Sequence, residues 1–278
     1  MATYDSPYRA ELYDIGFAQE DSFASDGAVY WEAYREMRTN APRHNSPYFV
    51  LDVGTGTGRI IRGLLDRSKN EKSSDETRFL GIDNSPHMLE RARAAVASTD
   101  QDHISYQLAS ALDLKSAVSD SSVDLLLMAV GTISHFSKPG EAECLLEQVS
   151  QVLRPDSGRA YISVLHMCQS STFENQPTPS EEQPWVVNQT SLSNPRIQYR
   201  QTYHTFHREG NVSNISSTLE VYDQTDPNAH RILHQDKSTA ICRLWEDDEL
   251  IRLAPTASLS HVKTIVRDNE HIYVFKKE

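Results

Sequence analysis

Short apolar runs alternate with segments of helical periodicity through the first half of the chain. Runs of this kind are typical of strands that are buried on both faces of a parallel sheet. The alternation, with short connections, predicts an α/β fold in which helices cover both faces of a mostly parallel sheet. The five expected strands, in chain order, are residues 48–53, 78–83, 104–110, 123–132 and 159–166.

The pattern changes after His166. Residues 168–184 are polar and proline-rich and predict a loop, and three runs with a period of two then predict a small antiparallel meander. A closing hairpin is expected where two apolar runs, 261–268 and 271–277, are separated by Asn269-Glu270. The three runs of the meander are residues 197–206, 212–223 and 232–245.

These patterns divide the chain into three parts. Residues 1–46 predict a helical segment that covers the site, and residues 47–166 with 246–278 predict the Rossmann-like core. Residues 167–245 are expected to form an antiparallel insertion after the fifth strand. At 278 residues, the chain is long enough for one α/β core with such an appendage.

Charge and composition exclude several classes of protein. The net charge is -12, and no cluster of lysines and arginines is visible, so a nucleic acid or an anionic membrane surface is a disfavoured partner. No run approaches the 18 apolar residues of a membrane span, and the polar N-terminus lacks the apolar core of a signal peptide, so we expect a cytoplasmic protein. The three cysteines lack the spacing of a disulfide framework or a zinc site.

The most informative stretch is YFVLDVGTGTGRIIRGLL, residues 48–65. A strand, a glycine-rich turn and a helix bring backbone N–H groups and the positive end of a helix dipole to a ligand. The spacing here is G-x-G-x-G, at Gly54, Gly56 and Gly58. It is one residue too short for the dinucleotide fingerprint, and no Gly-Lys-Ser/Thr follows, which excludes a P-loop.

With these motifs in order, the chain resembles the class I S-adenosylmethionine-dependent methyltransferases. The resemblance is carried by LDVGTGTGR, by the acidic strand end in GIDNSPHMLERAR, by VDLLLMAVGTISHF and by the VLRPDSG turn. It covers roughly residues 48–166 by motif and implies a seven-stranded sheet that ends in an antiparallel hairpin. It also implies S-adenosyl-L-methionine as the cofactor.

The resemblance assigns cofactor roles residue by residue. The glycines would let the backbone approach the methionine portion and the sugar, and Asp83 would accept the ribose hydroxyls, because two carboxylate oxygens suit a diol. Met88 would pack against the adenine, while Asp52 would shape the loop or face the ammonium group. An alternative is that Asp83, Asn84 and Ser85 only cap a helix. The expected cofactor-binding residues are Asp52, Gly54, Thr55, Gly56, Gly58, Asp83, Asn84, Met88, Ser110, Ala111 and Ala129.

One position departs from the family pattern. The family often has an acidic residue at the end of the third strand, where it bonds the adenine amine. In LASALDL this place is filled by Ser110, which could bond the base together with the backbone of Ala111. Asp113 would serve instead if the strand were shifted.

The arrangement is most similar to small-molecule N-methyltransferases, including those that act on amino sugars. ELYD resembles a segment that closes over the cofactor, and GTISHF resembles a stretch after their fourth strand. His135 is our candidate general base, since an imidazole titrates near neutral pH; a packing or capping role is an equal alternative. The Tyr13 hydroxyl could touch cofactor or acceptor, or Tyr13 could serve only as an aromatic residue covering the site.

The remaining candidate residues, two histidines, do not indicate a metal site. His204 and His207 are three residues apart on an expected strand, so their side chains would lie on opposite faces. We therefore expect a methyltransferase acting on a small molecule at nitrogen, oxygen or carbon, without a metal, as a monomer or homodimer in secondary metabolism. Two alternatives stay open: an enzyme that uses the sulfonium for a rearrangement, cyclisation or decarboxylation, and a non-catalytic cofactor-binding regulator.

Overall fold

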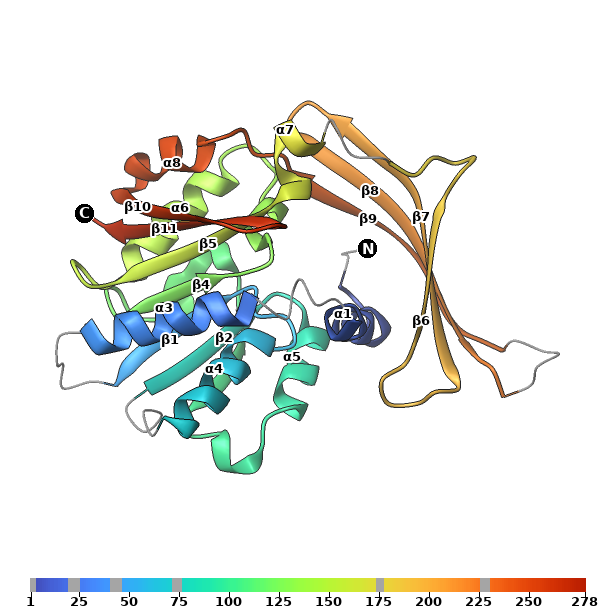
Figure 1. Ribbon diagram of the computed structural model, residues 1–278, viewed down its shortest axis with the longest axis horizontal. Coiled ribbons are helices and arrows are strands. Elements are labelled where there is room, and N and C mark those ends of the chain that lie inside the picture. Colours follow the sequence, from blue (N-terminus) through green and yellow to red (C-terminus); the bar gives the residue numbers. More distant parts are fainter. Residues whose placement is uncertain (1–3, 20–25, 41–46, 72–76, 174–177, 226–230) are drawn as a thin grey trace.

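The main sheet has seven strands. The computed structural model describes residues 4–19, 26–40, 47–71, 77–173, 178–225 and 231–278. Within them the strand order is β10-β11-β5-β4-β1-β2-β3 (Figure 1). The strands are β1 Tyr48–Val53, β2 Thr77–Asp83, β3 Ile104–Leu108, β4 Leu125–Met128, β5 Arg159–Leu165, β10 Leu259–Val266 and β11 Glu270–Lys277.

The predicted sheet topology is confirmed. Strands β1 to β5 pair in parallel, while β11 runs antiparallel to both β5 and β10. The C-terminal hairpin therefore extends the sheet beyond β5, as the two apolar runs at the end of the chain predict.

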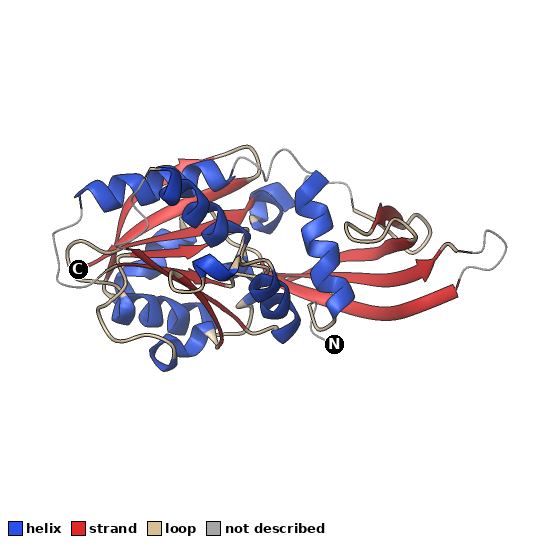
Figure 2. Cartoon of the chain, turned by 90° about the horizontal axis from the view of Figure 1, so that it is seen from below, coloured by secondary structure: helices blue, strands red, loops and turns tan. Residues whose placement is uncertain are grey.

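Helices cover both faces of this sheet (Figure 2). Along β1, Leu51 and Val53 are buried in one apolar cluster and Tyr48 and Val50 in another, so successive side chains enter opposite layers. A strand that is buried on both faces reads as a continuous apolar run, which explains the sequence pattern. The helices flanking the sheet are α3 Asp26–Asn40, α4 Arg59–Asn70, α5 Pro86–Ala94, α6 Glu141–Val152 and α8 Glu249–Leu253; the short 3-10 helices are η2 Ser98–Asp100, η3 Ala111–Ser116, η4 Thr132–His135, η5 His166–Cys168 and η6 Ala254–Ala257.

The aromatic residues of α3 belong to the core. Tyr30, Trp31 and Tyr34 are buried in the same cluster as the inner face of α4. The Tyr34 hydroxyl shares a hydrogen bond of 2.9 Å with Thr77 Oγ1 at the start of β2. These rings fix α3 on the sheet.

A second, antiparallel sheet follows β5 and has the order β6-β7-β8-β9. Three of its strands are the predicted meander, but the fourth, β6, was not expected, and the short helix α7 Ser170–Phe173 lies inside the predicted loop. Strand β6 was missed because its side chains are mostly exposed and carry no buried-face pattern. The strands are β6 Trp185–Thr190, β7 Ile197–Glu209, β8 Val212–Asp223 and β9 Arg231–Arg243.

Helix α1, Pro7–Gln19, lies between the core and the second sheet (Figure 1). Its Ile15 packs in a small cluster with residues of β7 and β8, and its Arg9 forms a buried ion pair with Asp236 of β9. On the core side, Asp14 pairs with Arg91 of α5 at 2.8 Å. Because α1 is fixed from both sides, it holds its N-terminal residues at the junction of the two sheets.

Candidate functional site

A cavity of about 450 Å³ lies at the carboxyl ends of the parallel strands. It is bordered by Gly54 and Gly56 after β1, by Asp83 at the end of β2 and by Val130 after β4. Its size is within the usual range for a small-molecule site, and open α/β sheets bind their ligands at this edge. The motifs that were separate in the sequence therefore meet at one place.

The three positions of the first turn must be glycine for different physical reasons. All adopt positive φ angles, +72° at Gly54, +56° at Gly56 and +75° at Gly58. A Cβ at Gly54 would collide with Thr132, and one at Gly58 would collide with Tyr106. A Cβ at Gly56 would meet only the Tyr13 ring, at 3.6 Å. Contacts within the protein thus account for Gly54 and Gly58, and Gly56 is the position where the bare backbone borders open space.

Asp52 and Ile82 hold the glycine loop in its shape through hydrogen bonds. Asp52 is buried, and its Oδ2 accepts a hydrogen bond of 2.7 Å from Thr55 Oγ1. The N–H groups of Gly54 and Thr55 both donate to the carbonyl of Ile82 at 2.9 Å. Four of the residues expected to bind the cofactor do not border the cavity: Asp52, Thr55, Gly58 and Ala129. For Asp52, the geometry fits the loop-shaping role.

Asp83 is held at the cavity by the backbone around it. Its Oδ2 accepts from Gly56 N at 2.9 Å, and its Oδ1 accepts from Ser85 N at 2.8 Å. Burial raises the pKa of Asp83, although these hydrogen bonds and the nearby His135 oppose the shift. A carboxylate has about four acceptor sites, so the backbone does not use its full capacity and hydroxyl donors of a ligand can still bind. Asp83 therefore fits the ribose diol that the sequence assigns to it.

The expected base-binding residues border the same cavity. Asn84 and Met88 line it from the start of α5, and Ser110 and Ala111 line it after β3. Ser110 Oγ accepts a hydrogen bond of 3.2 Å from Leu112 N, which leaves its hydroxyl hydrogen for a ligand. Strand β3 ends at Leu108, so it is not shifted, and Asp113 does not border the cavity.

The helix cap predicted at Ser85 is also present. Ser85 Oγ accepts from Met88 N at 3.3 Å. Capping and ligand binding are thus compatible here, because Ser85 provides the cap and Asp83 faces the cavity.

His135 lies in η4, directly after β4, and borders the cavity. The loop is anchored from behind, because Trp245 Nε1 donates a hydrogen bond of 3.2 Å to Ser134 Oγ. Burial lowers the pKa of His135, and the Asp83 carboxylate opposes this shift. The imidazole is therefore neutral at physiological pH, which is the form that accepts a proton.

Tyr13 of α1 borders the cavity next to Gly56. Its ring packs at 4.5 Å between centroids against Phe17, and Phe17 lies under the Arg59 guanidinium at 4.3 Å. These contacts join α1 to the start of α4 beside the glycine loop. The structure thus brings both candidate catalytic residues, His135 and Tyr13, to the same cavity.

Several bordering residues were not predicted. Tyr4 lies ahead of α1, and Thr239 and Ile241 come from β9 of the second sheet. At the end of β4, Val130 rather than the expected Ala129 borders the cavity. Val130 has a φ of +52°, which is rare for a β-branched residue and is found where function imposes strain. No sequence pattern distinguishes Tyr4 from Tyr8, which also precedes ELYD.

His204 and His166 make local contacts outside the cavity. His204 Nε2 shares a hydrogen bond of 2.8 Å with Thr218 Oγ1, and His166 packs edge-on against His271 at 4.9 Å. Among the residues that the structure describes, no group of three or more His, Cys, Asp and Glu side chains is arranged to hold a metal ion. In the same described part of the chain, every helix is too short or too polar to cross a membrane.

Comparison with known proteins gives matches over the domain and over the whole chain. Residues 50–156 match the model of a methyltransferase domain. The N-methyltransferase FrzE of Cladobotryum sp is 28% identical over 281 residues, which cover 98% of this chain and 96% of that relative.

Solved structures share the complete architecture. The sugar N-methyltransferase KedS8 from Streptoalloteichus sp ATCC 53650 superposes with a TM-score of 0.67 at 17% identity, over 96% of this chain and 94% of that one. CalS10 from Micromonospora echinaspora is an amino pentose methyltransferase that was solved with S-adenosylmethionine. It superposes with a TM-score of 0.63 at 13% identity, over 96% of this chain and 97% of that one. At such identities the likeness establishes the fold, including the second sheet.

Proposed function

We infer that this chain, an S-adenosylmethionine-dependent methyltransferase, transfers the methyl group to an amine nitrogen of a small molecule in secondary metabolism. The methyltransferase domain match supports the reaction class. The full-length relative and KedS8 are both N-methyltransferases, which favours nitrogen over oxygen and carbon as the acceptor atom.

One observation carries the proposal. Gly56, Asp83 and His135 come from three different strand ends and border a single cavity. The bare backbone at Gly56 suits the amino-acid end of the cofactor, and the Asp83 carboxylate suits its ribose. His135 supplies the group that would accept a proton from the acceptor.

The residues of the cavity fit S-adenosylmethionine. Asp83 would hold the ribose hydroxyls, Ser110 and Met88 would contact the adenine, and the backbone at Gly54 and Gly56 would face the methionine portion. When bound, the cofactor would supply an electrophilic methyl group on a sulfonium; an amine lone pair can attack that methyl carbon while the C–S bond breaks and the neutral thioether leaves. The protein's task is to align the acceptor and to keep its nitrogen unprotonated.

The neutral imidazole of His135 is suited to this task. An amine arrives mostly protonated at neutral pH, and His135 can accept that proton because burial, by lowering its pKa, keeps the imidazole in the neutral form. Asp83 lies close enough to stabilise the imidazolium that results, because it favours the charged form of His135. Tyr13, which covers Gly56, excludes water from this side of the cavity.

The test is a transfer assay with methyl-labelled S-adenosylmethionine and simple amines such as tyramine, phenethylamine and glucosamine. We expect label on nitrogen in at least one product, and no label with Gly56→Arg, whose side chain would fill the cavity. Oxygen-linked or carbon-linked label would overturn the choice of acceptor atom. A product that is rearranged but unlabelled would favour the non-methylating alternative.

A further inference from the structure

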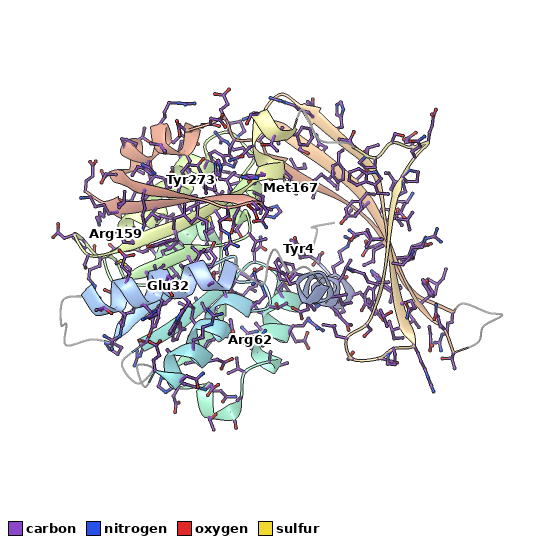
Figure 3. All side chains as sticks on the ribbon, viewed as in Figure 1. Tyr4, Glu32, Arg62, Arg159, Met167 and Tyr273 are labelled. Carbon is purple, nitrogen blue, oxygen red and sulfur yellow. The ribbon has the colours of Figure 1, made fainter. Side chains whose placement is uncertain are left out.

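Tyr4 occupies a central position between the two sheets (Figure 3). Its ring lies edge-on to two other rings, at 6.1 Å between centroids to Tyr13 and at 6.3 Å to His135. All three rings border the cavity. One side of the cavity is therefore walled by aromatic faces and edges that come from different parts of the chain.

The backbone at Tyr4 is fixed. Ser85 Oγ, which caps α5, donates a hydrogen bond of 2.8 Å to the carbonyl of Tyr4. Five residues later, Arg9 anchors the start of α1 to Asp236. Tyr4 is thus held from the core on one side and from the second sheet on the other. This placement gives the ring a defined orientation before any ligand binds.

The charges around the rings are negative. Of the side chains bordering the cavity in the described part of the chain, Asp5 and Asp83 are acidic and none is a lysine or an arginine. The nearby guanidinium of Arg9 is neutralised by its buried pairing with Asp236. Aromatic faces together with carboxylates attract a cation, and the net charge of -12 steers cations toward the protein as a whole.

We propose that Tyr4 is an acceptor-binding residue, and that the site selects amines that arrive as ammonium cations and carry no phosphate. The proposal rests on the proposed function, because it names the class of acceptor. The Tyr4 face, together with Tyr13 and His135, encloses the ammonium group, and His135 removes its proton. A phosphorylated or nucleotide-linked amine would bring its anion beside Asp5 and Asp83, where it is repelled.

Burial supports a neutral Tyr4 in this role. Burial, together with the neighbouring Cys242, Tyr203 and Asp83, raises the pKa of Tyr4 to about 12. The phenol therefore stays protonated throughout the physiological range. It keeps an electron-rich face and a hydroxyl that can contact polar groups of the acceptor.

The experiment uses probes that bind without turnover. Benzyltrimethylammonium cannot be methylated, and benzyl phosphate has a similar size with the opposite charge. Calorimetry on the complex of the protein with S-adenosylhomocysteine should give a dissociation constant at least about tenfold lower for the cation. Tyr4→Ala should weaken cation binding by about tenfold, whereas Tyr4→Phe, which keeps the aromatic face, should stay within about twofold.

Tyr8→Ala is the matched control, because Tyr8 lies four residues away and stacks on His234 at 4.9 Å, away from the cavity. It should leave cation binding within about twofold of the unmodified protein. Equal or tighter binding of benzyl phosphate, no binding of the cation, or an unchanged affinity in Tyr4→Ala would each overturn the proposal. Since no methyl group is transferred, failure here is distinguishable from failure of the labelling assay.

Discussion

The His135 imidazole and the Asp83 carboxylate interact electrostatically at the edge of one cavity, although they follow different strands. Asp83 opposes the lowering of the pKa of His135 by burial, and His135 opposes the raising of the pKa of Asp83 by burial. One residue is assigned to the ribose and the other to the acceptor. The two halves of the proposed reaction therefore share one cavity.

Replacing His135 should affect turnover more than cofactor binding. We expect His135→Gln to lower kcat by about 10²- to 10⁴-fold, as for loss of a general base, while the Kd of S-adenosylmethionine stays within about threefold. In the unmodified protein the acid limb of the pH profile should lie below the ordinary histidine pKa of about 6.5, because burial lowers the pKa of His135.

The matched control is His166→Gln, since His166 does not border the cavity. It should retain both kcat and the acid limb. If the acid limb persists in His135→Gln, His135 is not the general base and serves only in packing.

Removing the carboxylate of Asp83 should weaken the cofactor complex. We expect Asp83→Ala to cost about 1.5–3 kcal/mol of binding free energy, as measured by calorimetry, because charge-assisted hydrogen bonds are lost. Burial raises the pKa of Asp83, so affinity should begin to fall on acidification at a pH above the ordinary range of an aspartate, about 3.9. Asp113→Ala, which removes a carboxylate outside the cavity, should leave the affinity unchanged; an unaltered Kd in Asp83→Ala would show that the ribose lies elsewhere.

The glycines should differ in what they contribute to stability. Gly58→Ala should destabilise the fold by roughly 1–3 kcal/mol, because φ is +75° and the new Cβ collides with Tyr106. Gly63→Ala, in α4 where a Cβ meets nothing within 4 Å, should stabilise it by about 0.5–1 kcal/mol. Urea unfolding measures both, and equal effects at the two positions would refute the packing explanation for Gly58.

The ion pair between Arg9 and Asp236 should fix α1 and, through it, the site. Breaking a buried pair leaves an unpaired charge, so Asp236→Ala should cost about 3–5 kcal/mol and weaken acceptor binding. Asp223→Ala, on the same sheet at a position that is only partly buried, serves as the control for urea unfolding and for limited proteolysis within α1. Retained stability and slow cleavage in Asp236→Ala would argue against this role.

The same pair predicts a pH dependence. Burial alone would raise the pKa of Asp236, but hydrogen bonds from Arg9 and His234 outweigh it and hold the pKa below its ordinary value. The contribution to stability is therefore complete above the ordinary aspartate pKa of about 3.9 and is lost as the pH falls through the lowered value. Asp236→Ala should flatten this part of the curve of unfolding free energy against pH.

The sheet and the cofactor side of the site were predictable because they depend on local patterns. Buried parallel strands read as apolar runs, and Gly56, Asp83 and Ser85 each follow a strand at a fixed place. Parallel strands bring their carboxyl ends to one edge, so these residues had to meet. The division of the chain into three parts, and the role of each cofactor-binding residue, stay predictions.

The acceptor side was less predictable because it depends on contacts between distant segments. Tyr4 reaches the cavity only because α1 docks on β9 and α5, and Ile241 reaches it only because the second sheet folds back on the core. Neither relationship leaves a periodic signal. Strand β6 was missed for a similar reason. Its side chains are mostly exposed, so its sequence lacks the alternation of apolar and polar residues that a buried face produces.

We propose that the cavity beside Gly56 holds S-adenosylmethionine with its ribose on Asp83. A crystal structure of the complex with S-adenosylhomocysteine tests it most directly. We expect the ribose diol on the Asp83 carboxylate, the adenine between Met88 and Ser110, and the sulfur facing the side of the cavity that carries His135 and Tyr4. A complex in which the ligand lies elsewhere, or in which the protein's own side chains fill this cavity, would contradict the account.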